Sequence, residues 1–239
     1  MRPFALVWLP ASLALAGCSA AQPADETWFP LAEGRSWTYR VTTTFEDAGE
    51  TPQREQRTLR NRGRDSVDGA PAWRRRSDSG IDYWLRSDAS GVYRVASKSD
   101  LDRRPTLDEP RRYVLHSPYA VGTEWQASTI AYVLQRRNEV PREVRHTHKP
   151  VPMKYRIEAL GEPVETPAGR FDACLRVRGE AAVRLYVDAA FDWRDVALTT
   201  REWYCPGVGL VRLERVEPSP SRFMVGGTVT MELTAWKQR

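Results

Sequence analysis

The stretch SWTYRVT, at residues 36–42, alternates large apolar and polar side chains with a period of two. Trp37, Tyr39 and Val41 would therefore share one face of a strand, and the polar residues between them the other face. Polar alternate positions indicate antiparallel strands with one face in water, because parallel strands covered on both faces read as continuous apolar runs. The same alternation recurs in RFDACLRVR (170–178), VRLYV (183–187) and TVTMELTAW (228–236).

Short turn sequences containing Gly or Pro separate the alternating stretches, as at Asp68-Gly69 and Pro206-Gly207. Many short strands between such turns predict an all-β fold, an antiparallel barrel or a sandwich, formed by residues 28–239 as a single domain. Residues 188–196 are expected to form a loop with one helical turn. The expected strands are 36–45, 54–63, 71–77, 82–87, 91–97, 111–116, 124–135, 153–160, 170–178, 181–188, 198–205, 209–216 and 228–236.

The first strand is preceded by a phrase that occurs twice, as PLAEGRSW at 30–37 and PYAVGTEW at 118–125. Both copies fit Pro-x-Ala-x-Gly-x-x-Trp. Pro lacks a backbone donor, Gly permits the positive φ of a tight turn, and Trp then begins the alternating strand. The repeat predicts the same entry into a strand at both places. It fits an internally pseudo-duplicated fold, although chance recurrence in a chain with nine Trp is the alternative.

The N-terminus has the form of a bacterial export signal. An apolar stretch too short to span a bilayer follows Arg2 and ends in Leu-Ala-Gly-Cys, which resembles the lipobox of lipoproteins. Residues 1–17 are therefore expected to be a cleaved signal peptide, with Cys18 the lipidated first residue of the mature chain and residues 18–27 a flexible tether. Ser19 favours the outer membrane, with the protein facing the periplasm. An ordinary signal peptide with an incidental cysteine is the alternative.

The chain is basic, with a formal net charge of +5 and an isoelectric point near 9.3. We expect no nucleic-acid partner, because an exported lipoprotein does not meet nucleic acid and 31 acidic residues are interleaved with the cations. The strong bias of the cations toward Arg is typical of a GC-rich genome and does not by itself indicate a binding surface. A basic face lying against anionic lipid headgroups is the alternative. The charged, proline-broken segment 136–152 is expected to be a long loop of unassigned role.

Two cysteines remain if Cys18 carries lipid. Cys174 and Cys205 are expected to form a disulfide, because leftover thiols in an oxidising compartment are usually paired. The alternation places Cys174 on the polar side of its strand. Reduced, buried thiols and intermolecular pairing remain alternatives, and no His or Asn signature supports a catalytic thiol.

The residues carry no motif for catalysis or for a cofactor. His146 and His148 could share one face of a strand with His116 as a third ligand, but they lie among cations in the expected loop. We therefore expect no metal site, no cofactor and no enzymatic activity. A hydrolase is the less favoured alternative, for which the candidate acids are Asp108, Glu109, Asp192 and Asp195.

Adjacent aromatic residues occur at Trp28-Phe29, Tyr83-Trp84 and Trp203-Tyr204. Neighbours in a strand point to opposite faces, so one ring of each pair must leave the core. Such a ring could line a groove, contact lipid or another protein, or be covered by the stems of neighbouring Arg side chains.

Three stretches resemble a family of bacterial exported lipoproteins of the TapB-like or DUF3108-like kind: WFPLAEGRSWTYRV (28–41), VETPAGRFDACLRVRG (164–179) and EWYCPGVGLVRLER (202–215). The resemblance implies an antiparallel β-barrel or clam-like half barrel at the cell envelope, with no catalytic residues to transfer. It fits a non-enzymatic protein that presents a β surface or cavity to a lipid-like ligand or an envelope protein. A scaffold or assembly module without a ligand cavity is the alternative.

Overall fold

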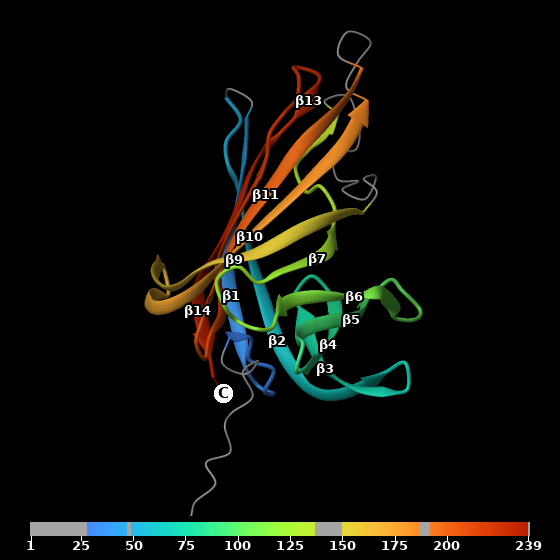
Figure 1. The fold of residues 1–239 in the computed structure, drawn as a ribbon, viewed down its shortest axis with the longest axis vertical. Coiled ribbons are helices and arrows are strands. Elements are labelled where there is room, and N and C mark those ends of the chain that lie inside the picture. The colour runs from blue at the N-terminus through green and yellow to red at the C-terminus, as the bar shows by residue number, and fades with distance from the viewer. Residues whose placement is uncertain (1–27, 47–48, 137–149, 187–191, 239) are drawn as a thin grey trace, which may run out of the picture.

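The computed structural model describes residues 28–46, 49–136, 150–186 and 192–238 (Figure 1). The expected signal peptide 1–17 and the tether 18–27 with Cys18 lie outside the described residues, as do His146, His148 and nearly all of the basic loop 136–152. In the part of the chain that is described, no helix is long and apolar enough to cross a membrane.

The described chain is built from strands. These are β1 (Ser36–Phe45), β2 (Gln53–Val67), β3 (Ala70–Ser77), β4 (Ile81–Asp88), β5 (Gly91–Ser99), β6 (Thr106–His116), β7 (Glu124–Thr129), β8 (Gln135–Arg136), β9 (Val151–Thr166), β10 (Gly169–Tyr186), β11 (Trp193–Cys205), β12 (Gly209–Glu217), β13 (Met224–Val225) and β14 (Gly227–Lys237). The short β8 and β13 pair with each other.

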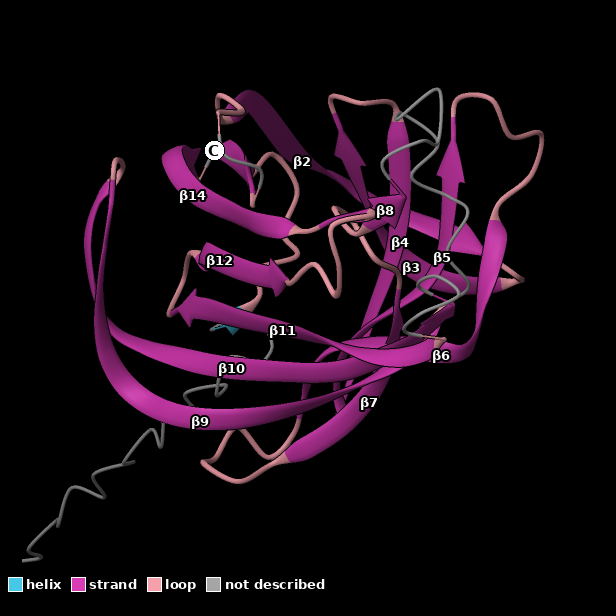
Figure 2. Ribbon diagram, turned by 90° about the horizontal axis from the view of Figure 1, so that it is seen from above, coloured by secondary structure: helices cyan, strands magenta, loops and turns pink. Residues whose placement is uncertain are grey.

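Twelve of the strands form one antiparallel sheet in the order β6-β5-β4-β3-β2-β1-β14-β12-β11-β10-β9-β7. The chain starts at the centre of this sheet, runs to one edge at β6, and returns from the other edge at β7 to the centre. The sheet curls so that its two edges approach each other (Figure 2), and Arg112 Nε on β6 donates a hydrogen bond of 2.8 Å to the carbonyl oxygen of Ser128 on β7. The nearly closed barrel confirms the all-β, antiparallel prediction.

The repeated phrase precedes the first strand of each of two runs of strands in this sheet. Gly34 and Gly122 both have positive φ, 83° and 94°, as the turn requires. Trp37 and Trp125 are the second residues of β1 and β7, and both are buried. β1 and β7 are the first strands of two meanders of six sheet strands each. The phrase thus has the same structural role in both halves.

Two large apolar clusters fill the space inside the curved sheet. The larger includes Leu115, Met153, Ile157 and Leu198, and the smaller surrounds the disulfide between Cys174 and Cys205. The pairing expected from the sequence is therefore present.

The segment before β1 is fixed to the inside of the barrel by a buried cation. The guanidinium of Arg75 lies 4.3 Å from the ring centroid of Phe29 and 4.5 Å from that of Trp37. Arg75 Nε donates to the side-chain oxygen of Asn61, and Arg75 Nη2 donates to the carbonyl oxygen of Pro30. Burial lowers the pKa of Arg75 to about 10. The rings and carbonyl groups therefore hold a positive charge that is expensive to bury.

Irregular strand positions overturn some details of the prediction. Ala173 adopts a φ of 60° in a stretch of β10 whose pairing with β9 shifts register, so Cys174 is buried rather than on the polar side. The register between β1 and β14 also shifts, with Thr38 opposite Ala235 and Tyr39 opposite Leu233. As a result Ala235 is exposed although strict alternation would place it inside.

Two strand boundaries also differ from expectation. β10 is a single strand of 18 residues where two strands were predicted. The expected helical turn over 188–196 is wrong for its described end, because Trp193–Val196 pairs with β10 as the start of β11.

Candidate functional site

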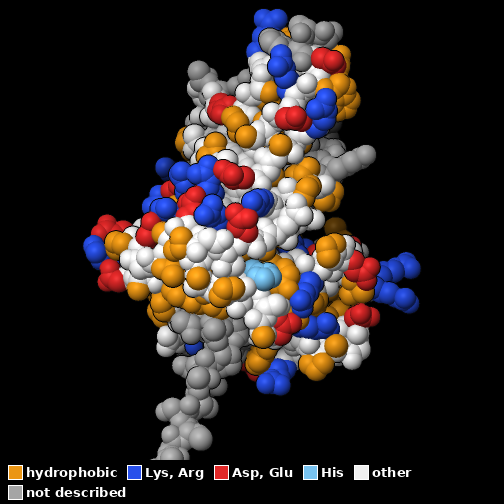
Figure 3. Space-filling model, viewed as in Figure 1, with side chains coloured by type: hydrophobic (Ala, Val, Ile, Leu, Met, Phe, Trp, Pro, Cys, Tyr) orange, Lys and Arg blue, Asp and Glu red, His pale blue; other side chains and the backbone are white. Residues whose placement is uncertain are grey.

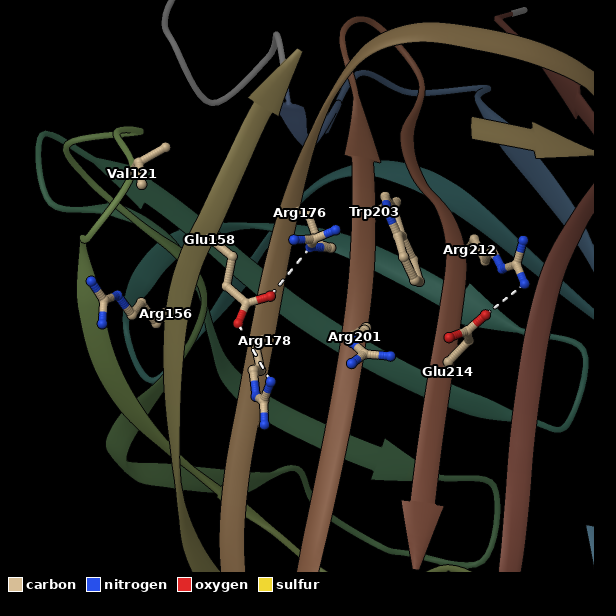
Figure 4. Close-up of a pocket in the computed structure, with 9 residues that line it drawn as sticks. All are labelled: Val121, Arg156, Glu158, Arg176, Arg178, Arg201, Trp203, Arg212 and Glu214. Carbon is tan, nitrogen blue, oxygen red and sulfur yellow. Dashed lines mark hydrogen bonds and ion pairs between the residues drawn. The ribbon is translucent and has the colours of Figure 1, made fainter. Parts of the chain in front are cut away.

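A groove of about 630 Å³ lies on the outer face of the sheet, across β9, β10, β11 and β12 (Figure 4). Strand alternation explains why its lining is polar. On β9, Tyr155 and Ile157 are buried while Arg156 points outward, and on β10 Val177 is buried between two arginines. The groove is lined by Val121, Arg156, Glu158, Arg176, Arg178, Arg201, Trp203, Arg212 and Glu214.

Strand register places three of these arginines side by side. Arg178 on β10 lies directly opposite Arg156 on β9 and directly opposite Arg201 on β11. We call these three residues the arginine row. The row ends in carboxylates, since Glu124 on β7 is opposite Arg156 and Glu214 on β12 is opposite Arg201. Like charges directly opposite each other destabilise a sheet, so the row is unfavourable on its own.

The members of the row differ in how well their charge is compensated. Arg178 has the carboxylate of Glu180 at 2.6 Å and that of Glu158 at 3.7 Å. Arg156 has a more distant carboxylate partner, Glu124, at 3.9 Å. Arg201 has no hydrogen-bond or ion-pair partner among the residues that the structure describes. The positive charge of the row that is least compensated by carboxylates therefore lies on Arg201 and Arg156.

The neighbouring arginines of the groove are paired. Arg176 binds Glu162 at 2.6 Å and Glu158 at 3.2 Å, and Arg212 binds Glu214 at 2.5 Å. Glu214 is held by Arg212 and makes no ion pair with Arg201 among the described residues, although the two lie opposite each other. The lining as a whole has five arginines and two glutamates, an excess of three positive charges. Figure 3 shows basic and acidic side chains gathered on this face of the molecule, over the neighbouring strands β9, β10 and β11.

Trp203 forms an apolar wall of the groove. Its Nε1 donates a hydrogen bond of 3.1 Å to Glu162, and the guanidinium of Arg212 lies 5.5 Å from its ring centroid. Tyr204, the next residue, is buried inside the barrel. This is the arrangement expected of adjacent aromatics, with one ring in the core and the other on the surface against a groove.

The residues considered for a metal site or a hydrolase do not converge. His116 lies against the rings of Tyr113 and Trp125, and within the described ranges no three His, Cys, Asp or Glu residues are grouped for a metal. Asp108 on β6 makes a bidentate ion pair with Arg94 at 2.6 Å. Asp195 on β11 lies 3.4 Å from Arg184, so one acid of each proposed pair, Asp108-Glu109 and Asp192 with Asp195, is in an ion pair with an arginine.

A carboxyl group also lies on the inner face of β11. Glu202 is partly buried and accepts a hydrogen bond of 2.5 Å from the hydroxyl of Tyr204. Burial raises the pKa of Glu202, and it raises the pKa of the Tyr204 hydroxyl well above its usual value. This pair belongs to the barrel interior, on the opposite side of the sheet from the groove.

Comparison with known proteins identifies no family for the chain. No family model and no curated protein matches it. Among solved structures, a predicted lipoprotein from Parabacteroides distasonis matches with 14% identity over 88% of this chain and 99% of that chain, with a TM-score of 0.40. A predicted exported protein with a YmcC-like fold, from Bacteroides fragilis, matches with 16% identity over 89% of this chain and 99% of that chain, with a TM-score of 0.38.

Both structures are described as lipoprotein or exported proteins, the class that the sequence predicted for this chain. The narrower TapB-like or DUF3108-like resemblance stays a prediction.

Proposed function

We propose that this chain is a non-enzymatic lipoprotein of the cell envelope that binds its ligand on an outer β surface. Acyl chains on Cys18 would hold it in the outer membrane, facing the periplasm, and the tether 18–27 would connect them to the barrel. The bound species is an anionic ligand, either lipid-like or displayed by an envelope protein. No nucleic acid or cofactor takes part.

The observation that carries this proposal is Arg201, an exposed cation without a described partner in a groove with excess positive charge. A guanidinium is a strong and rigid donor for carboxylate or phosphate groups. The groove is polar and open to solvent, which favours a charged group over the purely apolar ligand that an interior cavity would take.

Membrane fractionation tests the anchor. Cys18→Ser should move the protein from the membrane pellet to the soluble fraction, because the sulfur that carries the lipid is removed. Persistence of the variant in the pellet would contradict the anchor and leave the groove untouched.

Site-specific photo-crosslinking in cells tests the groove as a binding surface. A crosslinker at Val121, which lines the groove and is 58% exposed, should give a defined adduct. The control position is Leu101, 95% exposed and outside the lining. Identical adducts at both positions would remove the groove as the binding surface. A protein adduct confined to Val121 would favour the scaffold alternative, and a lipid or glycan adduct would favour a ligand-binding role.

A further inference from the structure

We infer that the arginine row, Arg156, Arg178 and Arg201, is a binding site for a phosphate group carried by a small molecule or a lipid headgroup. The inference rests on the proposed binding function and names the ligand class of the same groove.

The spacing of the row suits one polyvalent anion. Neighbouring strands lie about 4.8 Å apart, so three arginines on adjacent strands span roughly 10 Å across the sheet. The three cations face the same solvent side and repel one another in the free protein. An anion bound across Arg178 and Arg201 would offset that repulsion, so the folded sheet has a site in which binding relieves an existing electrostatic cost.

The charge balance favours phosphate over carboxylate. Arg178 already has two carboxylates nearby, whereas Arg201 has no described partner and Arg156 has one distant partner at 3.9 Å. A single carboxylate carries one charge and is satisfied by one guanidinium fork. A phosphate monoester carries −1.5 to −2 charges near neutral pH and three acceptor oxygens, so it can engage guanidinium groups from two or three strands at once.

The remaining groove has room for the group that carries the phosphate. Its volume of about 630 Å³ is far larger than a phosphate ion requires, and Val121 and Trp203 give it apolar walls. The ligand is thus a phosphorylated molecule whose phosphate lies on the row. Its source is either a soluble phosphorylated compound or the headgroup of a phospholipid.

Isothermal titration calorimetry on the full mature protein in non-ionic detergent tests the site. The probes are inorganic phosphate, dihexanoylphosphatidic acid and acetate. We expect saturable binding of at least one phosphate probe and binding of acetate that is about tenfold weaker or more. Stronger binding of dihexanoylphosphatidic acid than of phosphate assigns the headgroup source, and equal binding assigns a soluble source.

Arg201→Gln should weaken the phosphate probe about tenfold or more, since one charge-assisted hydrogen-bond partner is lost. Its melting temperature without ligand should be no lower than that of the parent, because the change removes like-charge repulsion. Arg156→Gln provides a second, independent variant. The matched control is Arg60→Gln, an exposed arginine on β2 outside the lining, which should bind as the parent does.

The inference is overturned if neither phosphate probe binds saturably, or if Arg201→Gln and Arg156→Gln both bind as tightly as the control. These failures are separate from failure of the proposed function. A specific crosslink at Val121 together with no phosphate binding would reject only the phosphate ligand class. Phosphate binding, together with release of the Cys18→Ser variant into the soluble fraction, would support both the phosphate site and the lipid anchor.

Discussion

Arg215 Nε donates a hydrogen bond of 2.5 Å to the carboxylate of Glu217, and their side chains are 3% and 0% exposed. Glu217 also accepts hydrogen bonds from the backbone amides of residues 132–134. Arg215 donates to the hydroxyl of Thr129 and to the carbonyl oxygen of Ile130. This buried pair on β12 therefore fixes the segment between β7 and β8 against the core.

Replacing Glu217 by Gln should destabilise the protein strongly. The change leaves Arg215 buried without its counter-ion and weakens the acceptor of three backbone amides. Breaking a buried pair from one side costs about 3–5 kcal/mol, because an uncompensated charge remains inside. The free energy of unfolding from urea denaturation measures the loss.

The matched control is Glu232→Gln, which breaks the surface ion pair between Glu232 and Arg40. The side chain of Arg40 is 47% exposed and that of Glu232 is 23% exposed. Exposed pairs contribute about 0–1 kcal/mol, so this variant should unfold close to the parent. Equal losses in the two variants would show that burial of the Arg215 pair does not matter.

Removal of the disulfide should lower stability through the unfolded state. Cys174 and Cys205 are 31 residues apart in sequence, and a bridge closing a loop of this length contributes about 3–4 kcal/mol in the chain-entropy model. The double variant Cys174→Ala, Cys205→Ala should unfold at correspondingly lower urea concentration. Non-reducing peptide mapping of the parent checks the pairing, and free thiols at both positions would contradict it.

The fold class was predictable because the period-two alternation is a property of the sequence itself. Residues 36–45 and 91–97 show this, since the predicted ranges match β1 and most of β5. Closure into a nearly complete barrel was not fixed by the alternation, since a sandwich has the same alternation. Closure depends on which edges meet, and the contact between Arg112 and Ser128 is between residues that no local pattern relates.

The phase errors have a common physical cause. An extra residue in one strand moves every later side chain to the other face, and such bulges leave little trace in composition. Ala173 is an ordinary residue, yet its φ of 60° separates the outward phase before it from the buried Cys174 after it. The disulfide itself was predictable because its prediction depended on the oxidising compartment and on the number of cysteines. Neither depends on which face of the strand Cys174 occupies.

The groove was only partly visible in the sequence. The sequence predicts that one ring of the pair Trp203-Tyr204 leaves the core, and the alternation places Arg176 and Arg178 on the polar face. The arginine row was missed because it depends on the register between three strands, which brings Arg156 and Arg201 beside Arg178 from positions 45 residues apart. Without that register, the sequence shows the arginines only as a compositional bias.

Gly91 and Gly122 both have positive φ, but they differ in the contacts that an added Cβ would make. A Cβ at Gly91, where φ is 128°, would overlap the carbonyl oxygen of Leu115 on the adjacent strand, whereas a Cβ at Gly122 would meet no atom within 4 Å. Gly122→Ala should cost about 1–2 kcal/mol from positive φ alone. Gly91→Ala should cost more, because the strands must also move apart.

Urea denaturation of the two alanine variants gives the comparison. The difference between them reports the close approach of β5 and β6 together with the less accessible φ of Gly91, 128° against 94° at Gly122. A loss at Gly91 no larger than that at Gly122 would show that the two strands adjust without cost.

Glu202 should make stability depend on pH. Its folded pKa is raised, first by burial, with the hydrogen bond from Tyr204 acting in the opposite direction. The folded protein therefore holds this proton more tightly than the unfolded chain, whose carboxyl has the ordinary value of 4.5. Stability from this group is fully present below pH 4.5 and is lost as pH rises through the raised folded pKa.

Glu202→Gln keeps a neutral, hydrogen-bonding side chain at every pH. The variant should be more stable than the parent at neutral pH, and the difference should shrink as the pH falls toward 4.5, where the parent carboxyl is also neutral. The control Glu165→Gln, at a side chain 78% exposed, should follow the parent at both pH values. Urea unfolding at neutral pH and near pH 4.5 is the measurement. A stability difference for Glu202→Gln that is independent of pH would mean that burial does not raise the pKa of Glu202.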